Sequence, residues 1–156
     1  MEAVKQDGGA LEFASDNLKD DKDILMQALE KVGWVACYAS DRLKDDKDVV
    51  LTAVKEVGWV VCYASEELKA DKEVILEGCK IDGQVLYYAS EELRDDKEVV
   101  LEAVKNKGII VKYASERLLR DNDIIIAAIT QNKKASIFIP IECREREEIK
   151  AVLEGE

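Results

Sequence analysis

A tripeptide of an aromatic residue, alanine and serine occurs five times in the chain, with consecutive copies 25 residues apart. A glycine, a leucine and an aspartate recur with the same period, and no insertion interrupts the register from Gly8 to Asp121. A fixed short period indicates one structural unit stacked on copies of itself, so that each unit buries its apolar face against its neighbours. The five copies begin at Phe13, Tyr38, Tyr63, Tyr88 and Tyr113.

The first half of each unit has the pattern of an amphipathic α-helix. Asp46 is a favoured N-cap residue, and positions 49, 50, 53, 54 and 57 place apolar side chains on one helical stripe. Gly58 is typical of the residue that follows a helix C-terminus. Helices are therefore predicted near residues 22–32, 47–57, 72–82, 97–107 and 122–132.

The second half of each unit is less clear from sequence. The run from Trp59 to Tyr63 is rich in β-branched and aromatic residues, which is compatible with a buried strand. The positions that stay constant between copies, 61, 64, 65 and 68, are spaced three to four residues apart, which favours a helix. Ser65 capping a separate final turn is an alternative. Second helices are predicted near residues 9–18, 34–43, 59–68, 84–93 and 109–118.

These patterns predict an all-α, solenoid-like stack of about five 25-residue two-helix repeats. The array covers residues 1–132, with the first unit partial, and a degenerate C-terminal capping segment covers residues 133–156. In that segment we expect irregular or extended chain around 137–141 and a last helix over 145–153. Because residues 1–5 match the middle of the helix at 97–107, the sequence begins inside a repeat, as a fragment cut from a longer array or as a natural half unit.

Composition narrows the possible partners. The net charge is −11 and no region is distinctly basic, which argues against nucleic acid and anionic membrane surfaces. No apolar run is long enough to insert into a membrane, and no signal peptide is visible. The four cysteines fit no zinc motif and the chain has no histidine. We expect a cytoplasmic or other reducing compartment.

No catalytic residue, cofactor site or metal site is predicted. The repeated Asp-Lys-acid segments lack the spacing of calcium loops and are interpreted as helix caps along a solvated acidic edge. The repeated serine has no histidine to act as a base. It is interpreted as a small residue at a tight helix contact, its hydroxyl bonded to a carbonyl one turn back. The aromatic residue ahead of each Ala-Ser is expected in the core between repeats.

Two columns change polarity between copies while the core columns do not, so their residues are predicted to be partly exposed. Tryptophans on neighbouring units would form an aromatic strip of the kind found at interface hot spots. The alternative is that both tryptophans merely cover the edge of the core, half buried. The candidate partner-binding residues are Trp34, Trp59, Cys37, Cys62, Tyr87 and Lys112.

The segment from Asp96 to Lys105, with Gly108 and the run from Tyr113 to Leu118, resembles the repeats of the domain-of-unknown-function family numbered 4116. The resemblance covers roughly residues 1–130. It implies tandem arrays like those of bacterial and protist proteins, some of which look like secreted effectors, so secretion stays open. The family has no assigned activity, and no site residue is carried over.

The leading functional prediction is a non-enzymatic helical-repeat scaffold that binds another protein. The alternative is an accessory repeat segment of a larger protein whose catalytic domain lies outside this sequence. A weaker third option is a small-molecule site on the tryptophan strip. We also expect possible end-to-end self-association through the N-terminal partial repeat, where Val4, Leu11 and Phe13 would be exposed.

Overall fold

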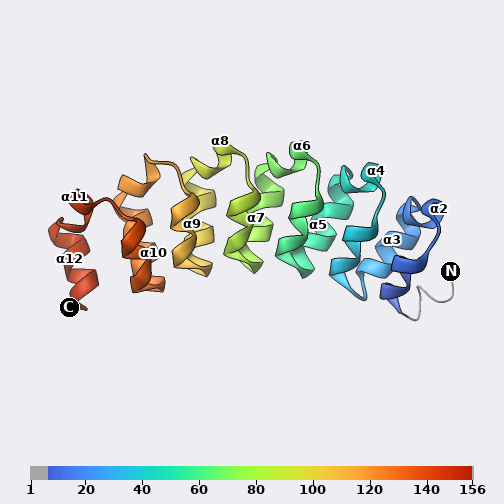
Figure 1. Ribbon diagram of the computed structural model, residues 1–156, viewed down its shortest axis with the longest axis horizontal. Coiled ribbons are helices and arrows are strands. Elements are labelled where there is room, and N and C mark those ends of the chain that lie inside the picture. The colour runs from blue at the N-terminus through green and yellow to red at the C-terminus, as the bar shows by residue number, and fades with distance from the viewer. Residues whose placement is uncertain (1–6, 156) are drawn as a thin grey trace.

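The computed structural model describes residues 7–155, which form a gently arched row of six similar units with the chain ends at opposite ends of the row (Figure 1). Each unit holds a six-residue 3-10 helix, a short helical turn and a longer α-helix. No β-strand occurs within these residues. The predicted all-α repeat stack is confirmed.

The units share the same order of elements. The 3-10 helices that open them are η1 (Gly8–Phe13), η2 (Gly33–Tyr38), η3 (Gly58–Tyr63), η4 (Gly83–Tyr88), η5 (Gly108–Tyr113) and η7 (Lys133–Phe138). The short elements are α2 (Asp16–Lys19), α4 (Asp41–Lys44), α6 (Glu66–Lys69), α8 (Glu91–Arg94), the 3-10 turn η6 (Leu118–Arg120) and α11 (Ile141–Arg144). The long helices are α3 (Lys22–Leu29), α5 (Lys47–Glu56), α7 (Lys72–Ile81), α9 (Lys97–Asn106), α10 (Asn122–Gln131) and α12 (Glu147–Glu154).

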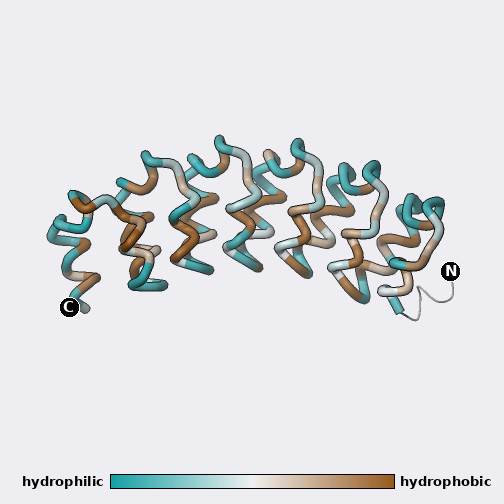
Figure 2. The backbone as a smooth tube through the Cα atoms, viewed as in Figure 1, coloured by the Kyte–Doolittle hydropathy of each residue, from teal (hydrophilic) through white to brown (hydrophobic). Residues whose placement is uncertain are grey.

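The units stack in two layers. Successive long α-helices contact one another, and successive 3-10 helices form a second layer that packs against the first. The short helices line one edge, at the top of Figure 1. One hydrophobic cluster runs between the layers from Leu11 to Ile149. Figure 2 shows the apolar stretches inside the row and polar chain at the edge that carries the short helices.

The long helices agree with the sequence prediction. Asp46 caps α5, because its carboxylate accepts the backbone N–H groups of Asp48 and Val49 at 3.1 and 3.2 Å. Residues 49, 50, 53 and 54 are buried, as the apolar stripe predicts. The equivalent carboxylates of Asp71 and Asp96 cap α7 and α9 in the same way.

The single second helix predicted for each unit is wrong. In the third unit, the 3-10 helix η3 ends at Tyr63, the backbone is extended at Ala64 and Ser65, and α6 begins at Glu66. Ser65 caps α6 by accepting the N–H of Leu68 at 3.3 Å, which confirms the alternative of a separate capped turn. The physical reason lies in the neighbouring unit. The Ser65 N–H donates to the Lys44 carbonyl at 3.2 Å, so it does not form a helical hydrogen bond within its own unit.

The serines join the units through both backbone and side chain. Their N–H groups bond the preceding unit in four copies, at residues 40, 65, 90 and 115. The prediction that the hydroxyl bonds a carbonyl one turn back is wrong, since Ser65 Oγ donates to the Asp45 carboxylate of the preceding unit at 2.6 Å. Ser40 and Ser115 make the same bond to Asp20 and Asp95. A short side chain is required here because it must reach a carboxylate of the preceding unit without pushing the two units apart.

The repeated glycine also has a different role from the one predicted. It opens the 3-10 helix and does not close the long helix, and within residues 7–155 only Gly155 has a positive φ. The glycine is needed for close approach. A Cβ atom on Gly58 would lie 3.0 Å from the Gly78 carbonyl oxygen, and on Gly8 it would lie 2.8 Å from the Ala28 oxygen. The 3-10 helix therefore rests directly on the backbone of its own unit's long helix.

The acidic edge is an ion-pair ladder and more than a solvated row of caps. Lys47 Nζ lies 2.7 Å from the Asp71 carboxylate and 2.9 Å from that of Glu73, both in the following unit. The same lysine-to-aspartate pair recurs at three further junctions, at 2.7–2.9 Å. Each cap carboxylate therefore also ties its helix to the unit before it. The repeated pairs are Lys22–Asp46, Lys47–Asp71, Lys72–Asp96 and Lys97–Asp121.

At the last junction, between the fifth and sixth units, basic residues occupy positions that hold aspartate in earlier units, and contacts between the units persist. Arg146 stands in the aspartate column and donates to the Asn122 side chain and to the Arg120 carbonyl, the latter at 2.9 Å. Arg120 stands where three of the four earlier units have an aspartate, and it pairs with Glu142 at 3.5 Å. The pair Arg117–Asp95, at 3.0 Å, has the opposite order. The degenerate sequence of the last unit is thus matched to the one neighbour that it contacts.

The C-terminal segment is more regular than its sequence indicates. We expected irregular or extended chain around residues 137–141, but η7 continues to Phe138 and only Ile139 and Pro140 are extended. The same two positions are extended in the first four units. Proline is accommodated because its φ suits extended chain. It has no N–H group, however, and cannot donate to the preceding unit as the serines do. The predicted last helix is present as α12.

The carboxylates of the ion-pair ladder predict that the folded protein loses stability in acid. Burial alone would raise the pKa of the four cap carboxylates, but hydrogen bonds from lysine and from backbone amides outweigh it and leave each pKa below its usual value. The four residues are Asp46, Asp71, Asp96 and Asp121. A folded pKa below the unfolded one adds stability above the unfolded value of about 3.9. That stability is lost as the pH falls through the folded pKa.

Urea unfolding measured between about pH 6 and pH 2.5 should therefore show a falling free energy of unfolding below about pH 4. An Asp71→Asn variant should show a shallower fall, because one of the four groups no longer titrates. A free energy of unfolding that stays level or rises on acidification would contradict the ladder.

Candidate functional site

An aromatic strip runs along the outer face of the 3-10 layer. It consists of side chains on η2, η3, η4, η5 and η7. Each of these 3-10 helices contacts the next one in this order. Edge-on ring pairs form within single helices: Trp34 with Tyr38 on η2 at 5.8 Å and Trp59 with Tyr63 on η3 at 6.1 Å between ring centroids. The members of the strip are Trp34, Tyr38, Trp59, Tyr63, Tyr87, Tyr88, Tyr113 and Phe138.

The strip is open to solvent although its rings touch the core. Trp34, Trp59 and Tyr87 are 37%, 42% and 51% exposed, values high enough for a partner to cover a large apolar area. The structure places five of the six candidate residues on this face of η2, η3 and η4, and Lys112 on η5 beside them. Cys37 and Cys62 are free cysteines of intermediate burial.

We expected the aromatic residues ahead of Ala-Ser to lie in the core between repeats, but they lie at its boundary or are exposed. Tyr63 is 42% exposed, Tyr38, Tyr88 and Tyr113 are half buried, and Phe13 is 85% exposed. The sequence carried a signal for this placement, because four of the five copies are tyrosine. A phenol hydroxyl needs water or a hydrogen-bond partner, which favours the boundary of a core over its interior.

Lysine side chains lie over the strip. Lys19 Nζ is 5.9 Å from the Tyr38 ring centroid, and Lys44 Nζ is 5.8 Å from that of Tyr63. Lys112 Nζ lies 4.7 Å from the Tyr113 ring and 5.9 Å from Phe138. Within residues 7–155, none of these lysines has a carboxylate within 4.0 Å, whereas the lysines of the ladder all do. Lys112 is among the residues predicted from the sequence, whereas Lys19 and Lys44 are not.

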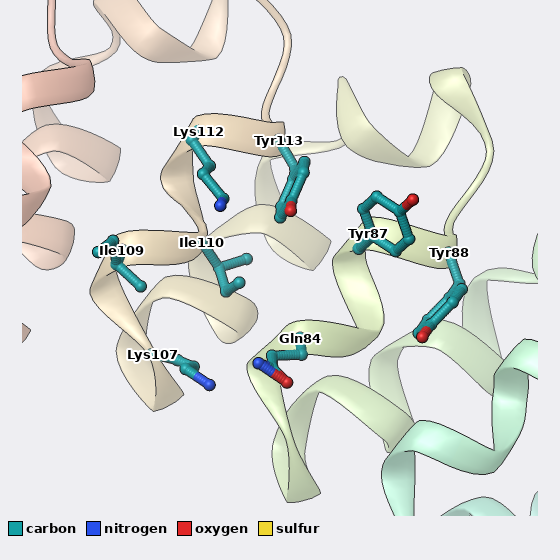
Figure 3. Close-up of a pocket in the computed structure, with 8 residues that line it drawn as sticks. All are labelled: Gln84, Tyr87, Tyr88, Lys107, Ile109, Ile110, Lys112 and Tyr113. Carbon is teal, nitrogen blue, oxygen red and sulfur yellow. The ribbon is translucent and has the colours of Figure 1, made fainter.

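The strip is hollowed between η4 and η5. The hollow has a volume of about 210 Å³, and Ile110, only 4% exposed, lies at its floor. Tyr87 and Tyr113 connect the two helices with ring centroids 5.0 Å apart. Figure 3 shows the Lys112 ammonium group and the Tyr113 hydroxyl directed toward the space above Ile110. The side chains of Lys107 and Gln84 point toward each other at its opposite end (Figure 3).

The cysteines have the chemistry of packed thiols. Burial raises the pKa of both Cys37 and Cys62, and burial raises the pKa of Cys79 in the core to about 12. A thiol with a raised pKa holds little of the nucleophilic thiolate at neutral pH. These side chains therefore contribute apolar contact to the strip and the core.

Two further features can be stated for residues 7–155. Their cysteine and acidic side chains form no group of three or more that could hold a metal ion. None of their helices combines the length and the apolar character that crossing a bilayer requires.

Comparison with known proteins gives one clear result. The family model described as domain of unknown function DUF4116 matches five overlapping stretches, residues 1–44, 22–69, 46–94, 71–118 and 96–144. Neither the curated proteins nor the solved structures yielded a match. The matches advance along the chain by one structural unit or nearly so, in step with the six stacked units of the fold. Because they span nearly all of its length, the chain belongs to the DUF4116 family as a tandem array of its repeats.

Proposed function

We propose that this chain is a non-enzymatic scaffold that binds another protein along the aromatic strip. The observation that supports this best is the recurrence of partly exposed rings on five successive 3-10 helices, from Trp34 on η2 to Phe138 on η7. Tryptophan and tyrosine are the residues that most often dominate binding energy at interfaces. Their rings also lose little conformational entropy on binding, because they are held by edge-on packing.

Other surfaces of the molecule suit binding less well. The long-helix edge carries the ion-pair ladder, whose lysines are already paired with carboxylates of the next unit. A partner on that edge would have to break existing pairs, while a partner on the strip would cover exposed rings and unpaired ammonium groups. The strip is therefore the face from which a complex gains the most.

The two tryptophans give the proposal a direct test, because they are the only ones in the chain and both lie on the strip. We expect a tryptophan-free peptide, selected for binding from a displayed random library, to change the tryptophan emission. The double change Trp34→Ala and Trp59→Ala should weaken that peptide by at least about tenfold, as loss of hot-spot rings does.

The matched control is Ile81→Ala at the end of α7. This residue is a large exposed apolar side chain, 49% exposed, that lies on a long helix and not on a 3-10 helix. We expect it to leave the dissociation constant unchanged, and far-ultraviolet circular dichroism to show that both variants fold. Equal binding by the tryptophan variant and the unchanged chain would refute the proposal.

End-to-end self-association through the N-terminal end stays a prediction, with its residues corrected. Leu11 is fully buried, because it packs inside the first unit, so it is not part of an open end. Phe13 is 85% exposed and is the residue of that end best placed to contact another copy. Val4 lies outside the described residues.

A further inference from the structure

The hollow between η4 and η5 differs in charge from the rest of the molecule. The chain as a whole carries 34 acidic and 23 basic residues, yet the hollow is lined by Lys107 and Lys112 and by no carboxylate. Within residues 7–155, neither lysine belongs to an ion pair. Two unpaired ammonium groups therefore lie at opposite ends of an apolar floor in an otherwise acidic protein.

Between η2 and η3, the sequence positions equivalent to those that line the hollow hold no charged residue. Trp34 and Trp59 stand where the hollow has Gln84 and Ile109, and Val57 and Cys62 stand where it has Lys107 and Lys112. The strip therefore has a tryptophan-rich half, where Lys19 and Lys44 lie over tyrosine rings, and a basic half, where lysines line the hollow itself. The basic half continues beyond the hollow, where Lys134 on η7 is exposed near Ile137, itself 67% exposed.

The polar groups of the hollow are arranged to bind a carboxylate. The Lys112 ammonium and the Tyr113 hydroxyl both point into the space above Ile110, and Lys107 and Gln84 lie at the other end (Figure 3). Ammonium, hydroxyl and amide groups can all donate hydrogen bonds to carboxylate oxygens. The volume of about 210 Å³ accommodates a side chain of aspartate or glutamate size beside an apolar neighbour.

We propose that this hollow receives an aspartate or glutamate side chain from an extended segment of the partner protein, whose apolar residues cover the tryptophan half of the strip. The inference depends on the proposed function, and it adds the chemistry and spacing of the partner. Packed helices lie about 10 Å apart and an extended chain advances about 3.3 Å per residue. The acidic residue should then lie about five residues from the one that contacts Trp59.

A displayed library of random 12-residue peptides, selected on the full chain, tests this inference. We expect selected peptides to combine apolar residues with an aspartate or glutamate at about that spacing. A selected peptide should bind the Lys107→Gln, Lys112→Gln variant about three- to tenfold more weakly, the scale of two partly exposed charge contacts. The difference should shrink as salt is added, because salt screens exposed charges.

Two controls isolate the contact. The Lys55→Gln, Lys105→Gln variant removes the same charge from exposed lysines of α5 and α9, and it should bind the peptide as the unchanged chain does. Replacing the acidic residue of the peptide by its amide should weaken binding to the unchanged chain but make no difference to the Lys107→Gln, Lys112→Gln variant.

The possible failures are distinguishable. Apolar peptides that need Trp34 and Trp59 but show no acidic preference would overturn this inference and leave the proposed function intact. An acidic preference that survives in the Lys107→Gln, Lys112→Gln variant would also overturn it. A library that yields no binder, or binders indifferent to the tryptophans, would count against the proposed function and this inference together.

Discussion

Replacing Gly108 with alanine should destabilise the protein by about 3 kcal/mol, although it adds a single methyl group. A Cβ atom at this position would overlap the carbonyl oxygen of Ala128 on α10, and it would lie 3.0 Å from Gln131 Oε1. A backbone carbonyl in a packed helix cannot move aside as a flexible side chain can. The 3-10 layer would have to separate from the long helix, which disturbs the stack on both sides. Urea unfolding would measure the loss.

The glycine series provides internal controls for this prediction. Gly9→Ala should change the free energy of unfolding by less than about 0.5 kcal/mol, because its Cβ would meet only the side chain of Asp7, at 3.2 Å. Gly58→Ala should fall between the two, since its Cβ would lie 3.0 Å from the Gly78 oxygen. A neutral Gly108→Ala variant would show that the two layers are not held as closely as the structure indicates.

The second large effect is expected from Asp71→Ala. The Asp71 carboxylate accepts the N–H groups of Glu73 and Val74 at 3.0 and 3.2 Å, and it pairs with Lys47 at 2.7 Å. Loss of an aspartate cap costs about 0.5–2 kcal/mol, and loss of a partly exposed ion pair adds up to about 1 kcal/mol. We expect a total near 2 kcal/mol in urea unfolding, because both losses occur at the same junction.

Asp21→Ala separates the two contributions. Asp21 caps α3 by accepting the N–H of Ile24 at 3.1 Å, and within residues 7–155 no lysine pairs with it. Its loss should therefore cost less than that of Asp71, by the value of the pair with Lys47. If the two variants lose the same stability, the ladder between units contributes nothing.

Calcium should leave the melting temperature of the unchanged chain where it was, since these carboxylates are caps.

The parts of the fold that depend on local chemistry could be read from the sequence. The long helices followed from an aspartate cap and an apolar stripe, both of which act within one or two turns of the chain. The partial exposure of Trp34, Trp59 and Lys112 followed from columns that change polarity. The number of stacked units followed nearly as well, because the period itself defines them.

The sequence fell short where a residue's partner lies about 20 to 26 positions away, in the neighbouring element or unit. Gly58 looked like a helix end, but its need for a hydrogen in place of a side chain arises from the carbonyl of Gly78. Ser65 looked like part of a helix, but its N–H and hydroxyl both bond the preceding unit. Nothing in a single unit specifies which of its groups face the next one.

The candidate site divides in the same way. The sequence by itself determined that two tryptophans recur at one repeat position, because identity and period need no coordinates. Only the tertiary structure decided that the tyrosines join them in one partly exposed strip. It also decided that Lys107 and Lys112 lie at opposite ends of the same hollow. The reason is physical: the direction of a side chain on a six-residue 3-10 helix depends on how that helix rests on its long helix and on its neighbour, and stacking fixes both.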